Sequence, residues 1–248
     1  MIRHRRLPAG AAGTAVLVAV LAAASAATAA TSAISGKVTP DHGAAGTPLS
    51  ITIGFTLDPE PAGQSMTLST SELKLPSNGV LNSRLFPTCN AATINARRGR
   101  FTDCPRGSQV GRGSFSADVP AADVFGVPGR VTIFNGGGTN ITVHIYATNP
   151  VLISEAFDAQ LVRTSGRYGY SMNIRVPDSM QEISDGWFAE LRRFTATVGA
   201  TAVVRGRRRG YVEAKRCPKS GRAPIAATFG FLRESAPTSA VGWISCRP

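Results

Sequence analysis

Short runs of alternating apolar and polar residues constrain the fold of this chain more than any other feature. Residues 49–57, LSITIGFTL, alternate in this way and are rich in β-branched side chains, which is typical of a half-buried strand. Further runs, most of them bounded by Gly, Pro, Asn or Asp, predict strands over residues 65–75, 113–119, 130–134, 140–147, 152–161, 169–176, 194–204, 210–215, 225–233 and 241–246. The pattern predicts an all-β fold with little helix, an antiparallel β-sandwich of Ig-like or larger Greek-key type.

Helix is expected in two places at most. Residues 91–96 could form one turn, and residues 180–194 place apolar side chains near one helical face, although Gly186 interrupts them. No repeat or long linker divides the chain, so residues 31–248 are expected to form a single β-sandwich domain. The alternative is two Ig-sized halves that meet near residues 118–129, because each half would then contain one pair of cysteines.

The first 30 residues have the pattern of a secretory signal peptide. Arg3, Arg5 and Arg6 form a basic start, residues 15–24 are an apolar run, and small residues with an A-x-A cleavage option at 27–29 follow. A membrane-spanning helix needs roughly 20 apolar residues, which argues against the alternative of a transmembrane anchor. We therefore expect a secreted, extracellular protein, at most loosely held at the cell envelope, without a transmembrane segment in its mature part.

The four cysteines, Cys89, Cys104, Cys217 and Cys246, all follow this leader. An even number of cysteines in an exported chain predicts disulfides, and we favour the sequence-local pairs Cys89–Cys104 and Cys217–Cys246. Each would stabilise the fold by about 3 kcal/mol on the chain-entropy model. A four-cysteine zinc site is the alternative, but it normally has pairs of cysteines only two to four residues apart, and this chain has none.

The formal net charge of +12 favours acidic partners. Two clusters of arginine stand out, one inside the first cysteine loop and one in a predicted hairpin tip between strands. They comprise Arg97, Arg98, Arg100, Arg205, Arg207, Arg208 and Arg209. Guanidinium groups bind carboxylate and phosphate in a bidentate manner, so an anionic wall polymer or polysaccharide is the expected partner. Solvated turns are the alternative interpretation. Nucleic acid is not expected, because no aromatic stacking platform accompanies the arginines.

The stretch CPRGSQVGRGSF, residues 104–115, has the glycines and the serine of a catalytic loop but not the required spacing. A phosphate-binding loop needs a lysine after its last glycine, and a nucleophile elbow needs G-x-S-x-G. In the segment from Gly107 to Gly111, Ser108 instead takes the second place, one position before the place that the motif requires. We interpret the stretch as a turn in which Gly107 adopts positive φ, while Gly111 and Gly113 permit a bulge or a close backbone contact.

No other residues form a convincing catalytic, cofactor-binding or metal-binding set. His42 and His144 have no His, Cys or carboxylate at ligand spacing. The acidic pair Glu155 and Asp158 would point to opposite faces of a strand, and Glu182 with Asp185 falls in a turn. We therefore expect no enzyme, no cofactor and no metal.

Several of these elements together resemble an uncharacterised secreted actinobacterial protein family. The shared features are an LPxG strand end, a cysteine, a CPxxSxVGxG turn, an FNG segment and a final CP…C pair. Here they are residues 75–79 with one extra residue, Cys89, residues 104–113, residues 134–136, residues 217–218 and Cys246. The resemblance implies secretion and β-structure, and it implies no activity.

The sequence thus predicts an exported, non-enzymatic β-sandwich protein that acts as a binding or structural module at the cell envelope or in the medium. The alternative is a secreted hydrolase of polysaccharide or ester bonds, which would require carboxylates or a Ser–His pair to converge in a cleft.

Overall fold

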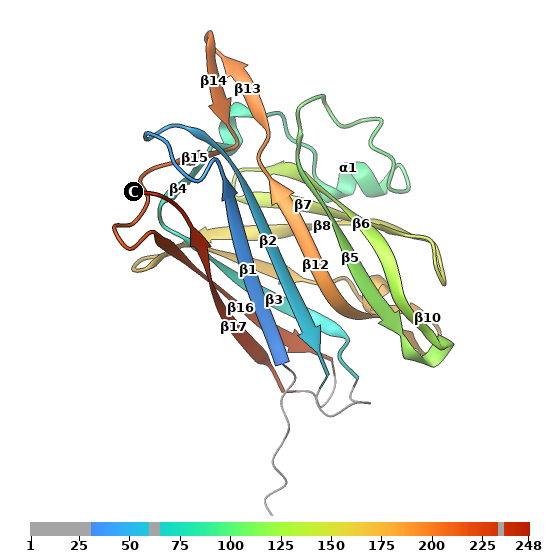
Figure 1. The fold of residues 1–248 in the computed structure, drawn as a ribbon. Coiled ribbons are helices and arrows are strands. Elements are labelled where there is room, and N and C mark those ends of the chain that lie inside the picture. Colours follow the sequence, from blue (N-terminus) through green and yellow to red (C-terminus); the bar gives the residue numbers. More distant parts are fainter. Residues whose placement is uncertain (1–30, 60–64, 233–235) are drawn as a thin grey trace, which may run out of the picture.

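The computed structural model describes residues 31–59, 65–232 and 236–248, and the predicted leader, residues 1–30, lies outside them. The described residues are mostly β-strand, as the sequence predicts (Figure 1). The strands of the main sheet are β1 (Thr31–Thr39), β2 (Pro48–Asp58), β3 (Leu68–Pro76), β4 (Gly79–Leu81), β5 (Gln109–Val119), β6 (Val124–Gly137), β7 (Asn140–Ala147), β8 (Ile153–Arg163), β9 (Tyr168–Arg175), β12 (Glu190–Val198), β15 (Val212–Ala214), β16 (Arg222–Phe231) and β17 (Thr238–Ser245).

The main sheet closes on itself, which does not confirm the expected two-sheet sandwich. Eleven of its strands form a barrel in the order β1-β17-β16-β3-β9-β8-β7-β6-β5-β12-β2, and β15 and β4 extend the sheet from β2. Closure depends on β1, which pairs parallel with β17 and antiparallel with β2. The sequence did not predict β1, and without it the sheet would have two open edges.

Strands that precede residues 118–129 in the sequence pair with strands that follow them, so both parts of the chain build the same barrel. The early strand β2 pairs with the late strand β12, and β3 lies between β9 and β16.

The predicted strand over residues 194–204 is divided, because β12 ends at Val198 and a new hairpin begins. That hairpin consists of β13 (Thr201–Val204) and β14 (Arg207–Gly210), and it projects beyond the barrel (Figure 1).

Within the part of the chain that the structure describes, helix is confined to short turns. The predicted turn is present as α1 (Ala91–Asn95), and residues 180–194 form part of α2 (Asp178–Gln181), followed by β10 (Glu182–Ser184), β11 (Trp187–Phe188) and β12. Single 3-10 turns cover Ser83–Leu85 and Pro120–Ala122. No helix among the described residues is long and apolar enough to cross a membrane.

Both predicted disulfides are confirmed. Cys89 pairs with Cys104, with 5.3 Å between their Cα atoms, and Cys217 pairs with Cys246 at 5.9 Å. The first disulfide closes a loop that carries α1. The Asn95 side-chain amide of this loop donates to the Ala156 carbonyl oxygen of β8 and accepts from the Ala156 N–H. The second ties the loop between β15 and β16 to the end of β17.

Candidate ligand-binding cavity

The second arginine cluster lies on the hairpin β13–β14, with Arg205 in the predicted turn and the other three arginines along β14. Arg205 and Gly206 form the turn with φ of 52° and 73°. Arg209 is not free, because its guanidinium makes two bonds of 2.8 and 3.0 Å to the Glu213 carboxylate. That contact is the main reason why the pKa of Glu213 is lowered to about 2. Within the described chain, Arg205, Arg207 and Arg208 have no carboxylate partner, so these three guanidinium groups are free for solvent or a polymer.

The first arginine cluster lies elsewhere on the molecule, in the loop after α1 (Figure 1). Arg97 is bonded to Asp103 at 2.6 Å, whereas Arg98 and Arg100 have no carboxylate partner among the described residues. The structure therefore divides the seven arginines into two separate groups, and an internal acid neutralises one arginine of each group.

The CPRGSQVGRGSF stretch is a turn that leads into β5, as interpreted from the sequence. Gly107 has φ of 85°, and the buried Ser108 hydroxyl donates to the Pro105 carbonyl oxygen at 2.7 Å. Gly111 lies at a register shift between β5 and β6. A Cβ atom on Gly113 would overlap the backbone of β12. These glycines therefore serve close strand packing, and Ser108 is committed to the turn.

His144 contacts Ser154, and the loop after α1 packs over this pair. Its Nε2 atom lies 3.2 Å from the Ser154 hydroxyl, and burial, together with the nearby Arg130, lowers the pKa of His144 to about 4. The loop after α1 lies directly over this pair, since a Cβ atom on Gly99 would overlap the Ser154 hydroxyl. Phe101 packs edge-on against the imidazole ring. The loop therefore packs against both side chains, with His144 buried and Ser154 half-buried.

The carboxylates of the predicted strand pair, Glu155 and Asp158, do not converge, as expected from their spacing. Glu155 accepts a bond from Ser179 of α2, while Asp158 accepts one from Thr142 of β7. Glu182 accepts the backbone N–H of Gly186. Within residues 31–59, 65–232 and 236–248, no group of three or more His, Cys, Asp or Glu side chains is placed to hold a metal ion.

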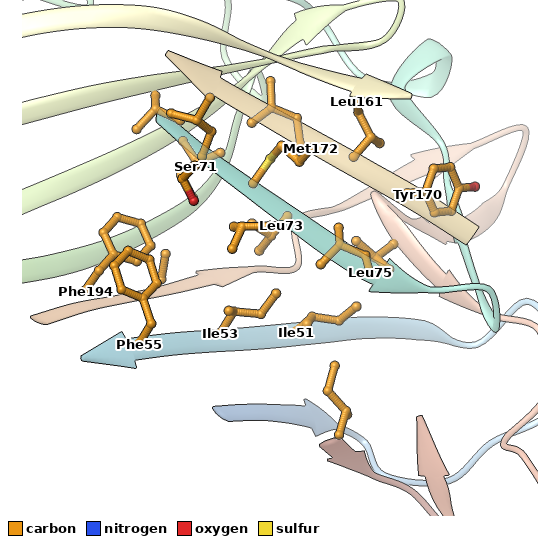
Figure 2. Close-up of a pocket in the computed structure, with 18 of the residues that line it drawn as sticks. Ile51, Ile53, Phe55, Ser71, Leu73, Leu75, Leu161, Tyr170, Met172 and Phe194 are labelled. Atoms are coloured by element: carbon orange, nitrogen blue, oxygen red, sulfur yellow. The ribbon is translucent and has the colours of Figure 1, made fainter. Parts of the chain in front are cut away.

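The barrel encloses a cavity of about 310 Å³. Alternate residues of the surrounding strands point into it, so that one face of each strand builds the wall. Figure 2 shows Ile51, Ile53 and Phe55 of β2 opposite Leu73 and Met172, which come from β3 and β9. The wall is apolar over most of its length.

Several large apolar side chains on this wall are only half-buried. Ile51, Ile53, Met172 and Phe194 all keep accessible surface, although they face the inside of the barrel. A packed core would cover such side chains, because protein interiors are normally as dense as organic crystals. The accessible surface therefore belongs to a cavity that a ligand can fill.

Ser71 places a polar atom in this apolar wall. Its side chain is buried, and its hydroxyl has no hydrogen-bond partner among the described residues. In Figure 2 the hydroxyl oxygen of Ser71 points away from β3 into the space between the strands. An unpaired buried hydroxyl costs about 1–3 kcal/mol, so this group is a ready partner for a polar atom of a ligand.

The charged residues that line the described wall lie at one end of the barrel. They are Asp41, Arg216 and Arg247, next to the ends of β1, β15 and β17. Arg247 bonds the Asp41 carboxylate at 2.8 Å, and His42 Nδ1 lies 2.7 Å from the same oxygen. These two contacts, with that of Arg247 the larger, lower the pKa of Asp41 to about 2.

Sequence reasoning did not find this cavity. Inward residues such as Ile53 have the same pattern in a packed core as in a hollow barrel, so alternation carries no signal for the cavity. For the charged end of the cavity, the sequence does contain an indication. Arg216 precedes Cys217 and Arg247 follows Cys246, so the predicted disulfide already implied that the two arginines lie close together.

In the comparisons with known proteins, no family model, no curated protein and no solved structure matches this chain.

Proposed function

We propose that this protein is an exported, non-enzymatic binding protein that holds a hydrocarbon chain inside its barrel. The observation that supports this most is the apolar cavity of about 310 Å³, which lies at the lower end of the range of about 300–1,000 Å³ common for ligand pockets. A single chain fits this size better than a multi-ring or multi-chain ligand.

The energetics of such a ligand are favourable in this wall. Each methylene group that leaves water for an apolar site gains about 0.8 kcal/mol. The half-buried Ile51, Ile53, Met172 and Phe194 would lose their remaining contact with water at the same time. A chain of about ten methylene groups therefore has enough driving force for binding once the entropy of association is subtracted.

Export is part of this proposal and rests on the leader of residues 1–30 and on the resemblance to secreted actinobacterial proteins. Two disulfides are consistent with it, because an oxidising extracellular compartment maintains them. The hydrolase alternative has less support. The structure brings His144 to Ser154, and this pair packs against the loop after α1 and not in an open cleft.

Titration of the delipidated protein with the neutral fluorescent probe N-phenyl-1-naphthylamine tests the proposal. We expect saturable enhancement of the fluorescence in the native protein. Ile53→Trp, which fills the cavity, should abolish it, and the matched variant Val241→Trp, at an exposed position on the outside, should not. Equal enhancement in both variants would mean that the probe binds to the outer surface, and the proposal would fail.

We also propose that the projecting hairpin β13–β14 holds the protein at an anionic wall polymer or polysaccharide. Support comes from Arg205, Arg207 and Arg208, which have no carboxylate partner in the described chain. Contacts of this kind weaken as salt rises. Elution from immobilised dextran sulfate measures the strength of the contact, with the three arginines changed to glutamine.

The matched control carries the same change at three exposed arginines of the barrel, Arg112, Arg163 and Arg175. The hairpin variant should elute at a clearly lower salt concentration than the control. If both variants elute together, net charge alone explains retention and the hairpin has no special role.

A further inference from the structure

The cavity differs at its two ends, and this difference indicates what kind of chain it holds. At one end, Met180, Ile183 and Ala189 from α2 and β10–β12 line the wall, with the exposed Asn149 beside them. At the other end the wall contains Arg216 and Arg247. A ligand aligned with this gradient has a hydrocarbon tail and a polar headgroup.

The disulfide Cys217–Cys246 brings the two arginines together. Each arginine is the sequence neighbour of one of the two cysteines, whose Cα atoms are 5.9 Å apart. The cross-link, together with the bond from the Cys246 N–H to the Gly221 carbonyl oxygen at the end of the β16–β17 ladder, therefore holds the backbones of both arginines at the same end of the cavity. Both residues are exposed as well as cavity-lining, so this end of the cavity reaches solvent.

This end has an excess of positive charge. Asp41 is the acidic residue of the lining, and its bond to Arg247 neutralises one of the two arginines. Arg216 has no carboxylate partner among the described residues. The loop around it, KRCPKSGR in residues 215–222, adds three further cations and no acid. A carboxylate or phosphate headgroup would find a free guanidinium here, whereas a cationic headgroup would be repelled.

From these observations we infer that the barrel selects a single-chain amphiphile with an anionic headgroup, whose tail lies in the cavity and whose headgroup lies at Arg216 and Arg247. The inference rests on the proposed function, because it adds the headgroup and the orientation to the hydrocarbon chain. The shared chemistry is a tail with a terminal carboxylate or phosphate monoester.

Displacement of N-phenyl-1-naphthylamine from the delipidated protein tests this inference. The competitors have the same tail and differ in the headgroup: dodecanoate, dodecyl phosphate, dodecanol and dodecyltrimethylammonium, all below their micelle-forming concentrations. We expect the anions to bind about tenfold more tightly than dodecanol, since a hydrogen bond to a charged group contributes that factor. The cation should bind most weakly. A preference for one of the two anions would identify the headgroup.

Arg216→Gln gives the decisive comparison, because it should reduce anion binding about tenfold and leave dodecanol binding unchanged. Lys219→Gln is the matched control, as Lys219 belongs to the same loop and does not line the cavity. An equal loss in both variants would overturn the inference in favour of general attraction, and so would equal affinity for dodecanol and the anions. Failure of every competitor and of the probe would instead refute the proposed function itself.

Discussion

His144 lies under the loop that follows α1 and should make the stability of the protein depend on pH. The imidazole is buried on the outer side of β7, against Ser154 and Phe101, and Arg130 lies near enough to disfavour its protonated form. Burial and this charge lower the pKa of His144 from 6.5 to about 4. At about 1.4 kcal/mol per pKa unit, the shift corresponds to on the order of 3 kcal/mol of folding free energy.

The sign follows from proton binding. Between pH 6.5 and pH 4 the unfolded chain binds a proton at this site and the folded protein does not. The free energy of unfolding should therefore fall as the pH falls through this interval, and this contribution should level off below about pH 4. Above pH 6.5 the contribution is fully present.

Urea denaturation at a series of pH values measures this effect in the native protein and in His144→Gln. The glutamine retains a hydrogen-bonding group but does not titrate, so its stability should vary less between pH 6.5 and pH 4. Ser154→Ala removes the contact partner and keeps the buried histidine, and it should retain the native pH dependence. Parallel curves for the native protein and His144→Gln would refute the reasoning, because another group would then cause the dependence.

Three further predictions concern the barrel and its loops. Replacing both Cys89 and Cys104 with serine should lower the free energy of unfolding by about 3 kcal/mol in urea denaturation, because a loop of this length is released; an unchanged midpoint would contradict this. Gly113→Ala should destabilise by about 1–3 kcal/mol by overlap with β12, whereas Gly79→Ala, which has room for a Cβ atom, should cost clearly less in the same assay. Ser71→Ala should raise the melting temperature of the ligand-free protein, since it removes an unpaired buried hydroxyl; a lower melting temperature would mean that this hydroxyl is satisfied.

Local patterns predicted the strands well where apolar and polar residues alternate. The predicted strand over residues 140–147 coincides with β7, and the predicted strand over residues 49–57 lies within β2. The disulfide pairs could be predicted as well, because sequence-local pairs close the shortest loops.

Closure of the sheet could not be predicted, because it depends on a strand with a weak pattern. The sequence of β1, TSAISGKVT, has only Ile34 and Val38 as large apolar side chains and directly follows the predicted leader. Its partner on one side is β17, with Gly36 opposite Ile244. Such a non-local pairing leaves no trace in the local sequence, so the strand pattern alone predicts a β-sandwich and not a closed barrel.

Intermolecular NMR contacts between the methylene groups of dodecanol and the methyl groups of the delipidated protein would show whether a hydrocarbon chain lies inside the barrel. We expect contacts to Ile51 and Ile53, which face the cavity, and none to Val203 and Val241, which are exposed on the outside. Contacts only to the exposed valines, or no contacts at all at saturating dodecanol, would contradict it.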